Sequence, residues 1–456
     1  MLEAKSLRDC EMGSGITIFT LTSARHEVDA YHHVIEALKK RIYIRAHMGI
    51  STDLWYSGNS LGAYLKYSYE GEHLPRPSGQ TTSWWYSPNI LQEFRESMPS
   101  LKQFILNLID SKKPGVFLID DDTWILEVFI IQLFNERKIP VVLLEHGPGF
   151  AYSLEVKGEI LSHTIRQSMG NLLSNLKYKI MTACMGPQLP RVRSFGLNGK
   201  YLICTYSKKT REILTKHGVN PNIIRDTGFP AFDSIIKSKP FLTENHKQRT
   251  RRRVLIISSG RGRFGDKDYA VTYYKFIVKL YAILKCRYDC YLRLKPGEDL
   301  AEFLNKNVLN DLLSCGIEFD DNKVLSEVAI PEYDLIIGEP SNLLYEAILL
   351  ERPVILIDSD HTSKICSPTW HFLYLIGMLT IDDRLTAYEI KEFVESAVRP
   401  DYLIGLTAKF RENADYYFNN CIDGRAGERI ADVVMEIMKK DGSSTGKPTV
   451  PRKRKL

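Results

Sequence analysis

The chain has 456 residues, of which 44% are hydrophobic and 25% charged, and its formal net charge is +6. This is enough chain for two or three domains with large cores, and the composition is typical of a globular protein. Much of the positive charge lies in two clusters, Arg249–Arg253 and the tail Arg452–Lys455. The rest of the chain is close to neutral, which argues against nucleic acid as a partner.

The cysteines suggest neither a zinc site nor a set of disulfides. Cys286 and Cys290 are the only close pair, and three residues between them with no second pair nearby fit no zinc spacing. On a helix the two would share a face, so we expect buried thiols in a reducing, cytoplasmic setting. The sequence predicts no signal peptide, and no apolar run reaches the roughly 18 residues of a spanning helix.

The N-terminal part predicts a βαβ unit. Residues 1–14 are expected to be a disordered lead-in, and Ile16–Leu21 reads as a strand. Glu27–Lys40 predicts a helix and Ile42–Ile44 a second strand. Residues 51–95 are rich in aromatic residues, serine, glycine and proline, and they predict loops and short elements.

From Leu91 onward, short apolar strands alternate with helices. Val116–Ile119 is a predicted strand that ends in Asp120-Asp121-Asp122, and Ile139–Leu144 is one that ends in Glu145-His146-Gly147. This alternation predicts a parallel sheet with both faces covered. Ligands of such sheets bind beyond the carboxyl ends of the strands, where both polar runs fall.

Residues 157–198 interrupt the alternation. Ile165–Cys184 predicts a basic amphipathic helix. Such a helix packs on its own domain or lies on a membrane surface, and both alternatives stay open here. We expect a first Rossmann-like domain over residues 15–236, with 157–198 as an insertion, and an interdomain linker over 237–250.

The second domain is predicted over residues 251–420. It opens with the strand Val254–Ile257, and residues 333–347 read as a buried strand, a polar turn and the start of a helix. Residues 421–440 predict a final helix, and 441–456 a basic disordered tail. The expected fold is therefore α/β, with two domains that each contain a parallel sheet.

The turn after the strand in 333–347 predicts a phosphate site, because a helix N-terminus presents free N–H groups and a favourable dipole to an anion. Several strand ends converge there and add hydroxyls, bare backbone and cationic side chains. Glu346, one helical turn further on, is expected to accept from ribose hydroxyls. The predicted binding residues of this region are Ser258, Ser259, Gly260, Arg261, Arg263, Lys295, Glu339, Ser341, Asn342 and Glu346, joined by Gly228 and Asp233 at the linker edge.

Each of these features also has a plain structural explanation. Arg261 and Arg263 could belong to a solvated turn, and Ser341 and Asn342 could be helix caps alone. The convergence of several such features in one predicted domain is what favours a phosphate group.

The first domain offers the catalytic candidates. His146 lies at a predicted strand end beside Glu145 and Gly147, and it could act as general base on an acceptor hydroxyl or simply tie a loop to the backbone. Asp121, in the acidic run, is a candidate for a metal, for a sugar hydroxyl or for a solvated turn. Arg25 and His26 follow the first strand and are expected at the same rim, where they would contact an acceptor anion.

Several motifs together resemble a known family. Glu145-His146-Gly147 is similar to a His-Gly turn, and 227–233 (Thr-Gly-Phe-Pro-Ala-Phe-Asp) is similar to an interdomain edge. The run 333–346 and the ending 423–430 are also similar to family segments. Over roughly 112–150 and 200–435, the chain resembles GT-B glycosyltransferase-fold proteins: CDP-glycerol glycerophosphotransferases, bacterial surface-polysaccharide transferases and UDP-N-acetylglucosamine 2-epimerases.

The resemblance implies two Rossmann-like domains whose parallel sheets face across a cleft, and a helix over 421–440 that crosses back to the first domain. It also implies a metal-independent enzyme that needs no cofactor. Its donor would be a nucleotide-activated sugar or a CDP-glycerol-like molecule bound to the second domain, and its acceptor a surface glycan or lipid-linked glycan. Pro230, in the interdomain edge, would join the substrate-binding residues. The sequence departs from the family at two places: Lys295 replaces a donor-binding histidine, and Pro340-Ser341-Asn342 replaces a serine pair.

Two alternatives stay open. The first is a UDP-sugar 2-epimerase, and the second is a catalytically degenerate module that binds a nucleotide-sugar or docks on a membrane. A membrane role would use residues 165–185 and the basic tail, which would place a cytoplasmic protein at the inner face of the membrane.

Overall fold

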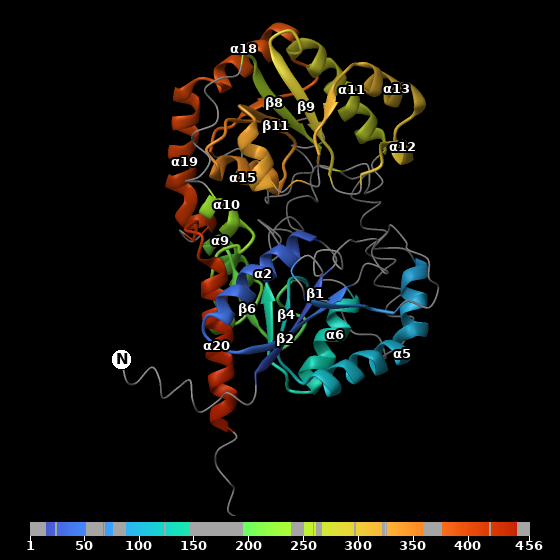
Figure 1. The fold of residues 1–456 in the computed structure, drawn as a ribbon, viewed down its shortest axis with the longest axis vertical. Coiled ribbons are helices and arrows are strands. Elements are labelled where there is room, and N and C mark those ends of the chain that lie inside the picture. The colour runs from blue at the N-terminus through green and yellow to red at the C-terminus, as the bar shows by residue number, and fades with distance from the viewer. Residues whose placement is uncertain are drawn as a thin grey trace, which may run out of the picture.

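The structure is a computed structural model of the chain. It describes residues 15–22, 25–51, 67, 69–75, 88–122, 125–145, 195–238, 250–258, 260, 267–295, 298–321, 324, 326–358, 376–418 and 421–444. These residues form an α/β fold with two parallel sheets, of seven and six strands, in two separate units (Figure 1). The predicted fold class is confirmed.

The sheet of the first unit has the order β3-β2-β1-β4-β5-β6-β7. Its strands are β1 (Ile16–Thr22), β2 (Ile44–Ser51), β3 (Glu70–His73), β4 (Pro114–Ile119), β5 (Val141–Leu144), β6 (Leu202–Thr205) and β7 (Ile224–Asp226). Alternate residues of each strand face opposite sides of the sheet, so Ile18 packs toward α2 (Arg25–Lys39), while Phe19 packs toward α5 (Pro88–Lys112) and α6 (Ile125–Glu136). Helix α9 (Lys208–Lys216) covers the α5 side as well.

The sheet of the second unit has the order β10-β9-β8-β11-β12-β13. Its strands are β8 (Arg252–Ile257), β9 (Tyr288–Arg293), β10 (Glu318–Phe319), β11 (Leu335–Gly338), β12 (Val354–Ile357) and β13 (Leu379–Ile381). One face packs on α11 (Lys267–Leu284), α12 (Leu300–Phe303), α13 (Lys306–Ser314) and α18 (Ala387–Ala397). The other face packs on α15 (Asn342–Leu349), α10 (Phe232–Ser238) and α19 (Pro400–Phe418).

The chain passes between the units twice. Helix α10, which the predicted boundaries place in the first domain, packs on α15 and on α14 (Ser326–Ala329) of the second unit. After α19 the chain returns as α20 (Ala426–Ser444), which lies along α2 of the first unit (Figure 1). Arg41 forms an ion pair with Asp432 across that contact.

Some local expectations were wrong. Helix α5 begins at Pro88, in a stretch that we expected to consist of loops and short elements, whereas β3, at Glu70–His73, is one of those short elements. The sequence of residues 300–315 predicts a single helix, but the structure divides it in two, because the Asn305 side chain accepts a hydrogen bond from Val308 N and starts a new helix. Cys286 is exposed in a turn and Cys290 is buried in β9, so the two thiols share no helix face. Among the described helices, none is both long and apolar enough to cross a membrane.

Candidate functional site

The register of the second sheet brings several strand ends to one edge. Ile257 of β8 pairs with Arg293 of β9 on one side and with Gly338 of β11 on the other. The chain leaves all three strands at the same level, so Ser258 and Glu339 start neighbouring turns. The predicted convergence of these two strand ends therefore follows from the pairing itself.

The turn after β11 leads directly into α15. Ser341 is the N-cap residue of this helix and has extended backbone angles, but its side chain makes no capping hydrogen bond. The Ser341 hydroxyl oxygen is shielded from solvent, and no group in the described part of the chain lies within hydrogen-bonding distance of it. A buried hydroxyl without a partner is costly, and this one lies where a helix start presents free N–H groups.

The turn after β8 and the end of β9 are in contact. Gly260 has a φ of +72°, and a Cβ atom there would lie only 2.6 Å from Cδ of Lys295. The aliphatic stem of Lys295 thus lies against the bare backbone of the glycine, while the lysine as a whole is exposed. A side chain at position 260 would force the lysine away.

Glu346 lies on α15 and has an unusual environment. Its pKa is raised to about 7, chiefly by burial. The nearby carboxylates of Glu327 and Asp29 contribute in the same direction, while a hydrogen bond from Ser326 and the charge of Arg293 act in the opposite direction. Asp29 belongs to α2 of the first unit, so a charge of that unit acts on Glu346 of the second.

Arg293 was not among the predicted residues. It is buried at the carboxyl end of β9, where it pairs with Asp320 and donates to the backbone oxygens of Asp321 and Val324. Its guanidinium therefore holds the chain after β10 against the site. Only its position at a strand end could have drawn attention to it in the sequence.

The acidic run of the first unit has three different environments. Asp122 is fully buried and accepts hydrogen bonds from Gly196 N and from the side chains of Asn198 and Tyr201, and burial raises its pKa to about 6. Asp120 accepts a hydrogen bond from the hydroxyl of Tyr31 at 3.1 Å. Asp121, the predicted catalytic residue of the three, is the most accessible of them.

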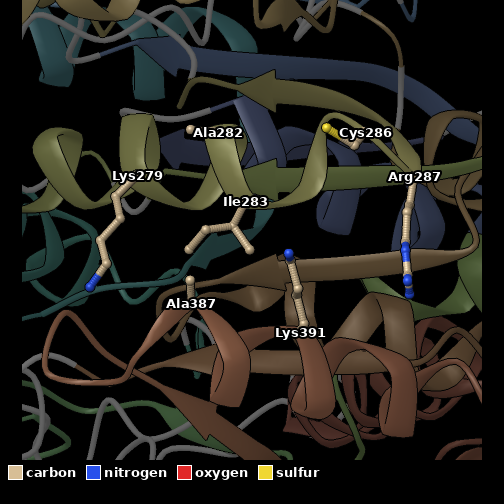
Figure 2. A pocket seen from close by; sticks show the side chains of 7 residues that line it. All are labelled: Lys279, Ala282, Ile283, Cys286, Arg287, Ala387 and Lys391. Atoms are coloured by element: carbon tan, nitrogen blue, oxygen red, sulfur yellow. The ribbon is translucent and has the colours of Figure 1, made fainter.

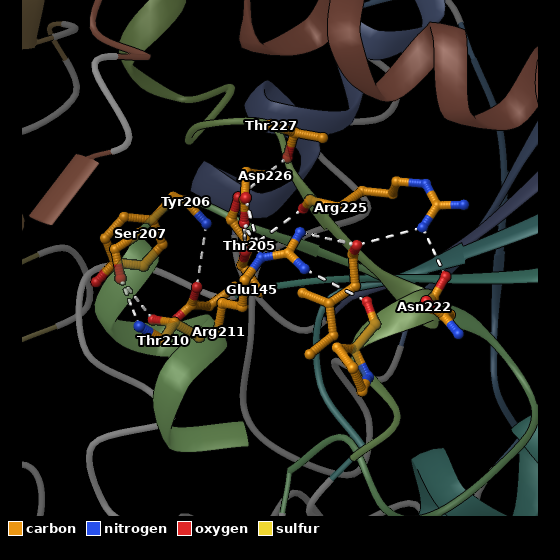
Figure 3. Close-up of polar contacts among 12 residues, drawn as sticks. Glu145, Thr205, Tyr206, Ser207, Thr210, Arg211, Asn222, Arg225, Asp226 and Thr227 are labelled. Atoms are coloured by element: carbon orange, nitrogen blue, oxygen red, sulfur yellow. Dashed lines mark hydrogen bonds and ion pairs between the residues drawn. The ribbon is translucent and has the colours of Figure 1, made fainter. Parts of the chain in front are cut away.

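Glu145 has a structural role that the sequence did not indicate. One of its carboxylate oxygens accepts from Tyr206 N at 3.2 Å and the other from the Thr210 hydroxyl at 2.7 Å (Figure 3). Ser207 caps α9 by accepting from Thr210 N. The buried Glu145 thus fixes the end of β5 to the start of α9.

Gly228, Pro230 and Asp233 lie where the chain passes between the units. Both carboxylate oxygens of Asp233 accept backbone N–H groups of α20, from Ala426 at 3.0 Å and Gly427 at 2.9 Å. Gly228 has a φ of +86°, and a Cβ there would lie 2.7 Å from the Cβ of Cys421. In the structure Gly228 and Asp233 contact the returning chain.

Several predicted features lie outside the described residues. They are His146, Gly147, Ser259, Arg261, Arg263, the lead-in 1–14, the helix 165–185 and the basic end of the tail. Arg25 and His26 are the first two residues of α2, but their side chains are also outside the description.

A groove of about 390 Å³ lies elsewhere, between α11 and α18 (Figure 2). Two of its cations already have partners: Lys279 donates to the backbone oxygens of Asp383 and Leu385, and Arg287 pairs with Glu395. This groove lies at the helical face of the second unit and not at the strand ends that form the candidate site. The described residues contain no group of three side chains that could hold a metal ion.

No protein-family model matches the sequence, and no curated protein matches it either. Solved structures do resemble the fold. UDP-GlcNAc 2-epimerase from Neisseria meningitidis, bound to UDP-GlcNAc, has a TM-score of 0.54 and 13% identity, covering 92% of this chain and 100% of that one. The glycotransferase of kitacinnamycin has a TM-score of 0.53 and 14% identity, covering 92% of this chain and 98% of that one. The wall teichoic acid polymerase TagF has a TM-score of 0.51 and 12% identity, covering 93% of this chain and 89% of that one. At these identities the likeness shows the fold, which is the GT-B arrangement of two Rossmann-like units.

Proposed function

We propose that the protein is a glycosyltransferase or glycerophosphotransferase. It would take a nucleotide-activated sugar or a CDP-glycerol-like donor and transfer its unit to a surface polysaccharide or glycolipid. The donor diphosphate would lie on the second unit, at the start of α15 and beside Lys295. The likeness in fold to proteins that handle UDP-sugars supports a nucleotide donor.

The single observation that carries this proposal is the Ser341 hydroxyl. It is buried at the N-terminus of α15 and has no hydrogen-bond partner within the described chain. A phosphate oxygen would accept its proton and also meet the free N–H groups of the helix. Lys295, held beside Gly260, would supply positive charge at the same edge.

The acceptor side of the reaction would use the first unit. We propose that His146 deprotonates the attacking hydroxyl, since a neutral imidazole is the usual general base near neutral pH. His146 follows Glu145 directly in the sequence, and Glu145 is fixed by Tyr206 and Thr210. These two hydrogen bonds therefore fix the residue that directly precedes the proposed base.

A nucleotide screen tests the donor site. We expect UDP or CDP to raise the melting temperature of the wild type and to bind in calorimetry. Ser341→Ala and Lys295→Met should each weaken binding about tenfold or more, because each loses a contact to the phosphate. Lys306→Met, at an exposed position on α13, is the matched control and should bind like the wild type. If no nucleotide binds the wild type, the proposed donor site is wrong.

The catalytic step needs a separate measurement. His146→Ala should lower turnover by at least about a hundredfold while leaving nucleotide affinity unchanged. Full transfer activity in this variant would remove His146 as general base.

An epimerase is the second candidate, because one of the similar structures is a UDP-GlcNAc 2-epimerase with the same two-unit fold. It would use the same donor pocket but no acceptor. Incubation with UDP-GlcNAc alone separates the two, since only an epimerase would form a C2-inverted sugar without a second substrate.

A further inference from the structure

A buried carboxylate lies just behind the proposed donor site. Glu298 follows β9 and is only 9% exposed. Its Oε1 accepts from the Ser258 hydroxyl at 3.0 Å and from the Tyr274 hydroxyl at 2.8 Å. Its Oε2 accepts from Lys295 N at 3.0 Å. One side chain therefore joins the turn after β8, the turn after β9 and helix α11.

The same contacts define what Ser258 can do. A hydroxyl has one proton, and that of Ser258 goes to Glu298, while its oxygen accepts from Gly260 N at 3.0 Å. Ser258 therefore has no proton left for a phosphate. Its bonds instead hold Gly260 in its left-handed conformation, against which Lys295 packs.

We propose that Glu298 is a positioning residue for the donor phosphate. It holds Ser258, and through it Gly260, in a fixed position relative to the backbone of Lys295. The lysine ammonium is thereby presented to the anion without any contact between Glu298 and the ligand. This rests on the proposed function, since it assigns how that donor site is built. Hydrogen bonds to a carboxylate are about twice as strong as neutral ones, which suits a fixed scaffold.

Glu298→Gln tests the proposal. The glutamine keeps the size of the side chain but has a single oxygen acceptor and an amide that donates, so at least one of the three donors loses its partner. We expect UDP, measured by calorimetry, to bind about tenfold more weakly, with unchanged stoichiometry. The Lys295 amide should also exchange its hydrogen about tenfold faster without nucleotide. Glu302→Gln, at an exposed position on the following helix, is the matched control and should match the wild type in both measurements.

The readouts separate positioning from a general loss of structure. A purely structural role would lower the fraction of binding-competent protein and leave the Kd of that fraction unchanged, which would overturn the proposal. Ser258→Ala provides a second route: because it removes the same connection, its effect on Kd should not add to that of Glu298→Gln. Additive effects would also overturn the proposal. Absence of UDP binding in the wild type would overturn the proposed function and the positioning role together, whereas an unchanged Kd in Glu298→Gln would overturn the positioning role alone.

Discussion

Glu346 is a candidate site residue whose ionisation depends strongly on the fold. Its pKa rises to about 7, chiefly through burial, from an ordinary value of 4.5. The folded state thus holds the proton more tightly than the unfolded state. The resulting stability is fully present below pH 4.5, and it is lost as the pH rises through 7.

Glu346→Gln removes this titration while keeping the shape of the side chain. We expect the variant to gain stability relative to the wild type as the pH rises from about 5 to about 7, because folding of the wild type must then take up a proton at Glu346. Above pH 7 the gain should stay constant, because the folded wild type then buries a negative charge near Glu327 and Asp29. Melting temperatures at steps across that range measure the difference. Glu302→Gln, at an exposed position, should show no such trend. A constant difference at every pH would contradict the raised pKa.

Individual roles were the hardest part to predict from the sequence. Asp233 and Glu145 were both predicted site residues, and Asp122 belonged to the acidic run. Asp233 binds backbone groups almost 200 positions later in the chain, and Glu145 binds Tyr206 and Thr210 across the insertion. A sequence motif shows that such an acid matters but does not show its partner. Their contribution to catalysis or substrate binding stays a prediction.

At the scale of elements, the apolar strands were the most readable feature. Strands such as Val141–Leu144 and Val354–Ile357 are buried on both faces, so every residue is apolar and the run is evident without any alternation. Helix α5 was only partly recognised, because it contains Pro99 and begins in a region rich in turn-forming residues. Short strand β3 has the sequence Glu-Gly-Glu-His, which gives no hydrophobic signal.

The N-terminus of α20 gives a prediction at this scale. Asp233→Ala would leave the N–H groups of Ala426 and Gly427 without their buried acceptor. We expect a loss of about 1–3 kcal/mol in the free energy of unfolding, measured in urea, with faster hydrogen exchange in the first turn of α20. Asp268→Ala, in the exposed first turn of α11, is the control and should cost less than about 0.5 kcal/mol. Equal losses in the two variants would mean that Asp233 has no special capping role.

At the scale of the whole molecule, the contact between α2 and α20 ties the end of the chain to its beginning. A Cβ at Gly427 would lie 2.8 Å from the backbone carbon and oxygen of His33, so the two helices meet backbone to backbone. The two-unit architecture was predicted from the alternation of strands and helices, and the returning helix from the resemblance of residues 423–430 to a family ending. The closeness of the contact between α2 and α20 was not predicted, because it depends on a single glycine, Gly427.

Gly427→Ala should therefore separate α20 from α2. Since neither backbone can yield locally, we expect a cost of about 1–3 kcal/mol, seen as a lower melting temperature and faster exchange in both helices. Gly405→Ala on α19 is a sharp control, because a Cβ there meets nothing within 4 Å. By helix propensity alone that variant should gain about 0.5–1 kcal/mol. A stabilising effect of Gly427→Ala would contradict the close contact.

The meeting of Gly228 with Cys421 has a mechanical consequence. The outgoing and returning segments touch there, since a Cβ on Gly228 would also lie 2.9 Å from the backbone oxygen of Cys421. Asp233 then bonds the outgoing segment to the start of α20. Because the outgoing and returning segments are held to each other, they restrict relative motion of the two units more than a single connection would. We expect this junction to limit how far one unit can slide past the other.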